Sequence, residues 1–254
     1  MLLALAVAGL LSLVAYITRL LTAGGAMAAT LVGAAVILGG TKWVMMLLFF
    51  FITSNALSRW RKTERDQLTG SVIEKGSRRD ATQVLVNGGI FAISAVLASG
   101  ADEFTWQAIG IGALCAATAD TWSTEIGTVL GGTPRGILNG RVVAPGTSGG
   151  ITIAGSIGAI MAALLTAVVA GSVGWGVSTM AIAAGGVAGS LVDSLVGASV
   201  QERLWCPACD ASTERRVHSC GTTSVHRGGI RGVDNDIVNL MSTLAGAVVT
   251  WTLT

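Results

Sequence analysis

The chain has 254 residues, of which 52% are hydrophobic and 12% are charged, and its formal net charge is +2. Soluble domains carry about 25% charged residues, so this composition excludes an ordinary water-soluble domain and indicates that lipid is the main solvent. The 35 glycines fit a membrane protein, because glycine lets membrane helices approach closely. The length fits a single domain, residues 1–254. We expect a membrane, but no nucleic acid, among its partners.

Long uncharged runs predict the membrane crossings. They cover residues 1–18, 23–41, 43–57, 81–101, 104–119, 142–192 and 237–254. A crossing needs about 20 apolar residues, so the sixth run is long enough for two, which residues 171–176 separate into spans near 151–171 and 175–197. The first run lacks the basic start and the cleavage site of a signal peptide, and we interpret it as a retained span.

These runs predict an all-α fold, a polytopic transmembrane helix bundle of about eight spans. Seven spans are also possible, because the segments 26–40 and 43–57 are short and are separated only by Thr41 and Lys42. These two segments could form a tight hairpin, or one of them could be a re-entrant piece.

Basic residues are concentrated in three loops. Of the 16 Lys and Arg, seven lie in 58–82, two in 120–150 and five in 201–235. Eight crossings place all three loops on the same side, and the positive-inside rule makes that side the cytoplasm. The loop 100–103 and both termini are then outside. Lys42 is the basic residue that disagrees, although a lysine at a hairpin tip can reach the interface.

The first polar motif, residues 118–127, begins at the cytoplasmic end of the fifth span. If the helix continues, Asp120, Thr124 and Gly127 share one face. Asp120 and Glu125, set among hydroxyl groups, suit a hard cation such as Mg²⁺, which prefers oxygen ligands. The alternative is a capped helix end with solvated acids.

A second carboxylate, Asp193, lies near the inner end of the seventh span. Gly189, Asp193, Gly197 and Gln201 follow one another at intervals of four residues. An ionisable residue inside a span is costly and indicates a functional site. The alternative is an aspartate satisfied by a neighbouring helix or an arginine.

The last span opens with Asp234, Asn235 and Asp236, followed by Asn239. A role as helix N-cap explains Asp234 or Asn235, but it does not explain Asp236 and Asn239 as well. We therefore expect one catalytic site at the inner ends of the fifth, seventh and eighth spans. Its predicted catalytic residues are Asp120, Glu125, Asp193 and Asp236; Asp120, Asp193 and Asp236 are the predicted Mg²⁺ ligands, with Asn235 and Asn239 in support.

Basic residues and glycine-rich turns are candidates for binding phosphate. Lys75, Arg78 and Arg79 lead into the fourth span, where Asn87 lies one or two turns inside. These cations could hold phosphate oxygens or could serve topology and anionic lipid, and we interpret the cluster 59–65 in the second way.

The turn 145–150 stands immediately before the sixth span. A glycine-rich turn that leads into a helix presents free N–H groups to phosphate, although it is also a common connector and does not match the P-loop pattern. Thr147, Ser148 and Gly149 are the candidates here, together with Arg141 just before the turn.

The loop 201–234 between the seventh and eighth spans is rich in cysteine and histidine. Cys206, Cys209, Cys220 and His218 have the spacing of a closed structural zinc site, with His226 as the other possible fourth ligand. Disulfides are not expected in a cytoplasmic loop. Free thiols, or a site that lacks its fourth ligand, are the alternative.

Four separated motifs together resemble a known membrane family. They lie at 119–127, 146–150, 193–198 and 235–239. The chain resembles the family that contains plant phytyl-phosphate kinase and vertebrate transmembrane protein 19. This resemblance implies phosphoryl transfer from a nucleoside triphosphate, CTP or UTP, to an isoprenyl monophosphate such as phytyl or geranylgeranyl phosphate, giving the diphosphate. Roles carry over to Asp120, Glu125, Asp193, Asn235 and Asp236, whereas the cysteine-rich loop is not part of the plant pattern.

Phosphoryl transfer agrees with the residues, because it needs Mg²⁺, positioning and cations more than covalent help. The alternatives are another CTP-using lipid enzyme, such as a CDP-lipid synthase or a polyprenol kinase, and a membrane transporter. A transporter should have polar groups near mid-membrane and on both sides, whereas here they gather at one end. A homo-oligomer is possible.

Overall fold

The computed structural model describes residues 1–70, 72–73, 76, 78–100 and 102–254. Within these residues the chain is mostly helical, which confirms the predicted class. The helices are α1 (Leu2–Ile17), α2 (Ala23–Gly39), α3 (Thr41–Arg59), α4 (Lys62–Thr69), α5 (Ala81–Leu97), α6 (Glu103–Leu130), α7 (Ile153–Ser172), α8 (Thr179–Ser199) and α9 (Asn235–Thr252). The short strands are β1 (Arg135–Gly136), β2 (Gly150–Ile151), β3 (Arg203–Cys206), β4 (Ala211–Thr213) and β5 (Val225–Gly228).

All the helices except the short α4 lie where the uncharged runs predicted crossings. By length and composition, α3, α7 and α8 are long and apolar enough to cross a membrane, whereas α1, α2 and α5 are apolar but only 16 or 17 residues long. The boundary between α2 and α3 is sharp because Gly40 has a φ of 98°. The long apolar run breaks between Ser172 and Thr179.

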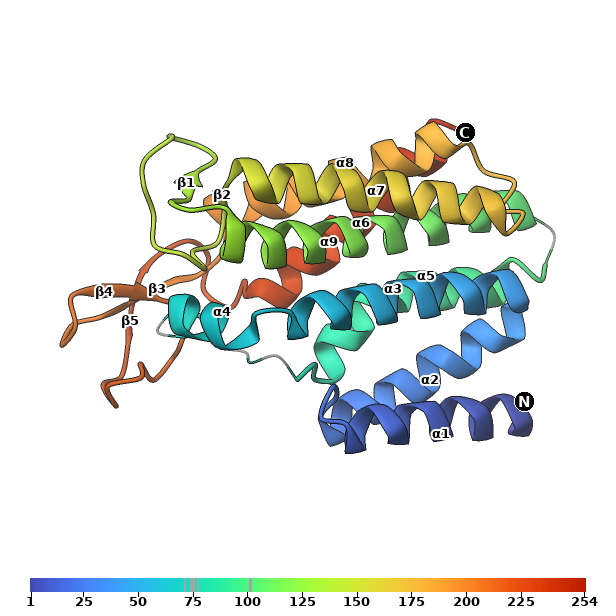
Figure 1. The fold of residues 1–254 in the computed structure, drawn as a ribbon, viewed down its shortest axis with the longest axis horizontal. Helices are drawn as coiled ribbons and strands as arrows, with labels where there is room; N and C mark the ends of the chain where they lie inside the picture. The colour runs from blue at the N-terminus through green and yellow to red at the C-terminus, as the bar shows by residue number, and fades with distance from the viewer. Residues whose placement is uncertain (71, 74–75, 77, 101) are drawn as a thin grey trace.

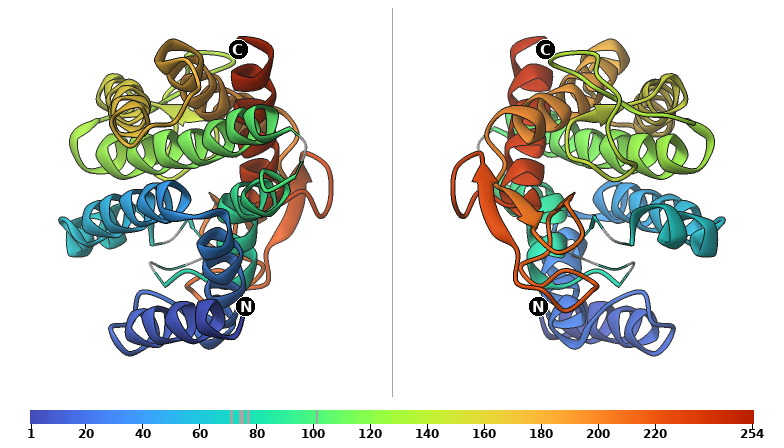
Figure 2. Two further views of the ribbon diagram at one scale, coloured as in Figure 1. Left: turned by 90° about the vertical axis from the view of Figure 1, so that its right-hand side faces the viewer. Right: turned by 90° about the vertical axis from the view of Figure 1, so that its left-hand side faces the viewer.

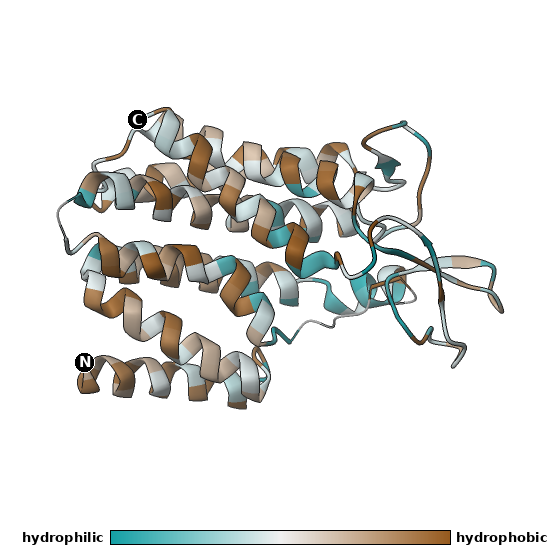
Figure 3. Cartoon of the chain, turned by 180° about the vertical axis from the view of Figure 1, so that it is seen from behind, coloured by the Kyte–Doolittle hydropathy of each residue, from teal (hydrophilic) through white to brown (hydrophobic). Residues whose placement is uncertain are grey.

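The long helices run side by side, and the strands, α4 and the longer loops gather at one end of the bundle (Figure 1). Both termini lie at the opposite end. Figure 2 views the bundle along its length from both ends. In Figure 3 hydrophobic residues extend along the helices, while hydrophilic residues concentrate toward the end with the strands. We call this the polar end.

Helix α6 is the centre of the bundle, in contact with α3, α5, α7, α8 and α9. It has 28 residues and continues well past the predicted apolar stretch 104–119. The sequence motif at 118–127 is therefore helical throughout, and α6 carries it to the polar end.

Lys42, the basic residue outside the three basic loops near the second and third helices, forms an ion pair at the end of the bundle opposite the strands. Its Nζ lies 3.0 Å from Oε1 of Glu103, at the start of α6. This pair joins the beginnings of α3 and α6, so the basic residue that disagreed with the charge pattern has a local acidic partner.

Small residues set the distances between α6, α8 and α9. A Cβ atom added to Gly246 of α9 would lie 2.7 Å from the carbonyl oxygen of Gly112 in α6 and 3.0 Å from that of Gly185 in α8. Hydroxyl groups add interhelical hydrogen bonds, as between Ser242 Oγ and the Gly189 carbonyl at 2.9 Å. Close approach through small residues is the usual way in which membrane helices associate.

We predict that Gly246→Ala destabilises the bundle by about 1–3 kcal/mol, because the new methyl group meets backbone atoms that cannot rotate away. Gly89→Ala is the matched control, since an added Cβ there has no described atom within 4 Å. Thermal unfolding in detergent should show a lower midpoint for Gly246→Ala and an unchanged or slightly higher one for Gly89→Ala. Equal midpoints would contradict the close packing.

Candidate functional site

A cavity of about 620 Å³ opens at the polar end, between α4, α5, α6, α8, α9 and the loops. We call it the main cavity. Most of the predicted site residues line it: Arg79, Asn87, Asp120, Glu125, Thr147, Ser148, Gly149, Asp193, Asn235, Asp236 and Asn239. The structure therefore brings together four sequence motifs that lie far apart along the chain.

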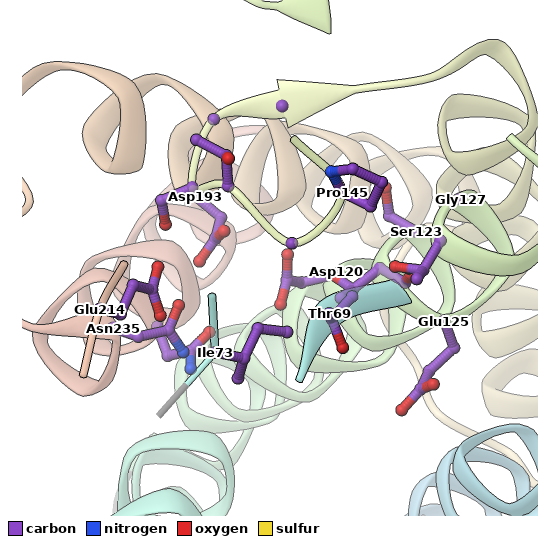
Figure 4. A pocket seen from close by; sticks show the side chains of 18 of the residues that line it. Thr69, Ile73, Asp120, Ser123, Glu125, Gly127, Pro145, Asp193, Glu214 and Asn235 are labelled. Carbon is purple, nitrogen blue, oxygen red and sulfur yellow. The ribbon is translucent and has the colours of Figure 1, made fainter. Parts of the chain in front are cut away.

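Asp120 of α6 and Asp193 of α8 face each other across this cavity (Figure 4). Their carboxyl groups lie close enough to interact with each other. Oδ1 of Asp193 is buried and has no hydrogen-bond partner among the described residues. Two ionised carboxylates this close repel each other, and a cation held by both removes the repulsion.

Helix packing explains why these two residues meet. One helical turn before them, an added Cβ at Gly189 of α8 would collide with the side chain of Ala116 of α6. The two helices run in the same direction (Figure 1), so residues four positions further along, Asp120 and Asp193, come together as well.

Helix α9 brings Asn235, Asp236 and Asn239 to the same cavity. Asp234 is its N-cap, since its Oδ1 accepts hydrogen bonds from the backbone N–H groups of Asp236 and Ile237, both at 3.1 Å. Asp236 and Asn239 are buried, with 6% and 8% of their surface exposed. The capping alternative thus holds for Asp234 alone.

Asp236 does not complete a tight cluster with Asp120 and Asp193. Among the described residues, the group of three or more Cys, His, Asp or Glu whose ligand atoms all lie within 4.8 Å of one another is the cysteine and histidine group described below. The three aspartates share a cavity without forming a closed shell, which leaves room for water or substrate oxygens between them.

Glu125 is held by partners within the protein and points away from Asp120 (Figure 4). Arg65 Nη1 lies 2.7 Å and 2.6 Å from its two carboxylate oxygens, and Ser58 Oγ donates to it at 2.5 Å. Arg65 therefore has a partner inside the protein, a role that the interpretation of the cluster 59–65 as a topology signal did not include. Its neighbours Arg61 and Glu64 pair with each other on the exposed side of α4.

Three more arginines line the main cavity, Arg79, Arg215 and Arg216, and of these Arg216 has Nη2 3.8 Å from Oε2 of Glu202. Arg79 lines it and makes no side-chain hydrogen bond or ion pair among the described residues; its pKa is lowered by burial, an effect opposed by the charges of Glu125 and Asp120. Arg215 also lines the cavity, and its buried Nε has no hydrogen-bond partner among the described residues. Sequence reasoning missed Arg215, because nothing in the spacing of a basic loop residue indicates that it points inward.

Two predicted phosphate ligands, Arg78 and Arg141, do not line the main cavity. Arg78 turns the other way, where its Nη2 donates to the Leu21 carbonyl at 2.9 Å and its guanidinium lies over the Tyr16 ring. Arg141 is exposed beside the β1–β2 hairpin and does not line the cavity. Arg78 and Arg141 therefore do not line the main cavity, where we expected them, because adjacency in sequence does not fix side-chain direction. Lys75 lies outside the described residues.

The turn at 145–150 packs on the end of α8. Gly149 has a φ of 74°, and a Cβ there would lie 2.7 Å from Cα of Ala198. Ser148 Oγ donates to Gln201 Oε1 at 2.5 Å, and Gln201 Nε2 donates to Glu214 at 2.9 Å. This chain of hydrogen bonds links the glycine-rich turn to the loop that carries Arg215.

Cys206, Cys209, His218 and Cys220 form a compact group that could bind a metal ion, beside the three-stranded sheet β4–β3–β5. Their ligand atoms all lie within 4.8 Å of one another. Contacts with Thr222 and His218 lower the pKa of the Cys220 thiol to about 5, while the contact with Cys220 raises the pKa of Cys209 to about 11. A metal would bind thiolates here, so its binding would displace protons.

His218 is the histidine whose ring lies in this group, whereas His226 contacts Glu202. Nδ1 of His226 lies 3.3 Å from Oε1 of Glu202 instead. Nδ1 of His218 lies 3.2 Å from Sγ of Cys220.

The loop beyond β4 is anchored where α4 ends. The backbone N–H of Glu214 donates to the Val72 carbonyl at 2.8 Å, and Thr213 Oγ1 donates to the same oxygen at 3.3 Å. The backbone N–H of Arg215 donates to Thr213 Oγ1 at 3.2 Å. The cysteine and histidine group and this anchor therefore fix the two sides of the segment that presents Arg215.

Comparison with known proteins identifies the family of this chain. The family model of the integral membrane protein DUF92 matches residues 6–247. The chain belongs to this family. It is therefore an integral membrane protein, as the composition predicted.

Two relatives agree with this assignment. Protein PGR of Arabidopsis thaliana is 28% identical over 276 residues, covering 97% of this chain and 93% of the plant protein. An uncharacterized membrane protein of Methanocaldococcus jannaschii, MJ0933, is 31% identical over 218 residues, covering 83% of this chain and 75% of its own length. The resemblance to the plant family is thus confirmed. No solved structure matches the chain.

We predict that Arg65→Met and Glu125→Gln each lower the free energy of unfolding by about 1–3 kcal/mol, because each leaves a nearly buried partner unpaired. Both side chains have about 12% or less of their surface exposed. The double variant should lose less than the sum of the two, since the partners share one interaction.

The exposed pair Arg61 and Glu64 on the same helix is the control, with an expected effect of about 0–1 kcal/mol. Unfolding should be followed by denaturant titration in detergent. Additive losses in the double variant, or equal losses in the control pair, would argue against a coupled Arg65–Glu125 contact.

Proposed function

We propose that this protein is a membrane-embedded kinase. It transfers a phosphoryl group from a nucleoside triphosphate, CTP or UTP, to an isoprenyl monophosphate such as phytyl or geranylgeranyl phosphate, and the product is the diphosphate. The observation that carries the proposal is the facing pair Asp120 and Asp193 in a cavity that is also lined by the guanidinium groups of Arg79 and Arg215.

The donor set fits Mg²⁺. Asp120 and Asp193 would hold the ion, since their carboxyl groups meet and Oδ1 of Asp193 is buried with no described hydrogen-bond partner. Asp236, Asn235 and Asn239 line the same cavity with further oxygen atoms, which Mg²⁺ prefers. A bound Mg²⁺ would neutralise charge on the phosphate oxygens.

Arginine side chains supply the positive charge that phosphates need. Arg79 and Arg215 line the cavity without a carboxylate hydrogen bond among the described residues, so their donors can turn to phosphate oxygens. Arg65 already forms an ion pair with Glu125. We therefore assign Arg65 and Glu125 to positioning α4 against α6 rather than to contact with the transferred group.

The glycine-rich turn would complete the nucleotide site. Thr147, Ser148 and Gly149 line the cavity, to which α5 contributes Asn87. The hydrogen bonds from Ser148 to Gln201 and from Gln201 to Glu214 connect this turn to the segment that carries Arg215. Backbone N–H groups in such turns approach phosphate closely because glycine has no side chain.

The lining of the cavity favours direct transfer over a covalent intermediate on the protein. Among the described residues that line it there is no histidine and no cysteine, so a Ser-His or Cys-His pair for nucleophilic catalysis is not found in that part of the chain. Phosphoryl transfer relies on positioning and charge instead.

In the membrane we propose eight crossings, α1–α3 and α5–α9, with the polar end in the cytoplasm. Fourteen of the 16 basic residues belong to the three loops at that end, as the positive-inside rule expects. The loop 201–234 is then cytoplasmic. A lipid phosphate can approach the main cavity sideways, because its head group lies at the same level.

We also propose that Cys206, Cys209, His218 and Cys220 hold a structural Zn²⁺. Three thiolates and one imidazole fill a tetrahedral shell and leave no open position for catalysis. The ion would stabilise a small sheet that has little core of its own.

To test the kinase, purified protein should be incubated with Mg²⁺, CTP or UTP and a panel of prenyl monophosphates, and the products identified by mass. We expect a prenyl diphosphate. Asp120→Asn and Asp193→Asn should each lower turnover by about 100-fold or more, because the charge that binds the cation is lost while shape is kept.

Asp102→Asn is the matched control, because Asp102 caps α6 at the opposite end and asparagine caps equally well. A CDP-linked product would favour a CDP-lipid synthase. Near-parental turnover in both site variants would exclude these aspartates as the metal ligands.

Elemental analysis of the purified protein should find about one zinc per chain. Cys206→Ser or Cys209→Ser should lose it, because a hydroxyl is a poor substitute for a thiolate ligand. Cys115→Ser, which changes the cysteine in α6 far from this group, should retain it. Protein without zinc, or equal zinc in all three variants, would refute the assignment.

A further inference from the structure

A second, smaller cavity lies at the polar end between the end of α1 and the end of α3. Its volume is about 190 Å³. The residues that line it are Thr18, Arg19, Leu20, Asn55, Ser58, Arg59 and Lys62. We call it the α1–α3 cavity. None of its lining residues belongs to a motif that the sequence analysis identified as catalytic.

The lining of this cavity is positively charged. Three of the residues are cationic, and no acidic residue is among the described lining residues. Arg59 donates to the Thr18 carbonyl at 2.7 Å, whereas the side chains of Arg19 and Lys62 make no hydrogen bond or ion pair in the described part of the chain. Cations gathered around one hollow repel each other, and an anion between them relieves that repulsion.

The α1–α3 cavity shares its wall with the main cavity. Ser58 lines both, and its Oγ donates to Glu125. The turn after α1 joins them a second time, because the backbone N–H of Arg79 donates to the Leu20 carbonyl at 3.0 Å. Leu20 lines the smaller cavity, while Arg79 lines the larger one. On α4, Lys62 likewise lines the smaller cavity and Arg65 the larger.

Exposed apolar side chains adjoin the α1–α3 cavity on the bundle side. Ile17 at the end of α1 is 68% exposed, and Ile52, one turn before Asn55 on α3, is 61% exposed. In a membrane protein such faces border hydrocarbon. Helix α1 packs on α2, while α3 packs on α2, α6 and α7, so a hydrocarbon chain could lie along the faces of α1 and α3.

We propose that the α1–α3 cavity binds the phosphate of the lipid acceptor as it approaches from the bilayer, with its hydrocarbon chain against α1 and α3. The ligand class is a phosphate monoester that carries a long apolar chain. The inference rests on the proposed function only in naming this lipid as the acceptor, because the binding itself requires no nucleotide.

The test measures binding without nucleotide, on the full chain in nanodiscs of neutral lipid. The probes are radiolabelled farnesyl monophosphate, farnesol and inorganic phosphate. The variant is Arg19→Gln with Lys62→Gln, which removes two cations that have no described partner. The matched control is Arg61→Gln with Arg231→Gln, which removes the same charge from exposed residues at the polar end that line neither cavity.

We expect farnesyl monophosphate to bind the parent more tightly than either farnesol or inorganic phosphate, because both the charge and the chain contribute. The Arg19/Lys62 variant should weaken this binding by about tenfold or more through the loss of charged contacts, and the control should not. Nucleotide binding should be unchanged in both variants, which separates this cavity from the main one.

Several results would overturn the proposal. Equal weakening in the variant and the control would show a general effect of surface charge, and no weakening in either would place the lipid elsewhere. Inorganic phosphate that binds as tightly as the lipid would indicate a free-phosphate site, and full displacement by excess phosphatidylglycerol would indicate a structural lipid. Failure of the kinase assay would leave the binding result standing, so the two proposals fail separately.

Discussion

The contact between α6 and α8 through Ala116 and Gly189 sets the geometry on which the candidate site depends. The helices run in the same direction and touch closely there, because Gly189 has no side chain. One turn later the same approach puts Asp120 opposite Asp193. A side chain at Gly189 would push the helices apart and separate the carboxylates. The close packing of small residues in the interior therefore determines how far apart the two carboxylates at the polar end lie.

The charges at the polar end divide into two groups. Glu125, Arg65 and Ser58 satisfy one another and join α6 to α4 and α3. The carboxyl groups of Asp120 and Asp193 lie next to each other, while the guanidinium groups of Arg79 and Arg215 line the same cavity. A buried charge that lacks a partner costs free energy, so this second group favours ligands that bring both a cation and anionic oxygens. A metal–nucleotide complex has that composition.

Contacts between the loops at the polar end determine where the side chains that line the main cavity lie. The Arg215 segment is fixed on one side by the cysteine and histidine group and on the other by Val72. Ser148, Gln201 and Glu214 then connect it to the glycine-rich turn. Such a network lets short loops, which have little apolar core, present side chains in fixed directions.

The sequence by itself determined the helical class and the positions of the long helices, and it predicted that Asp120, Asp193, Asp236 and Asn239 lie near one another, as they do around the main cavity. Apolar run length and the spacing of polar residues along a helix are local properties, so they are readable without a structure. The sequence also identified Cys206, Cys209 and Cys220 as one group, because their spacing along the chain is short.

Only the tertiary structure decided which arginines face the main cavity. Arg65 and Arg215 point inward, while Arg78 and Arg141 do not. Long flexible side chains in neighbouring positions can turn to opposite sides, and the partner that selects one direction, such as Glu125 for Arg65, lies far away along the chain. The same holds for His218 over His226, since Glu202 takes the second histidine. Which basic residues bind ligand is a question of long-range contacts, and these form only when the helices pack.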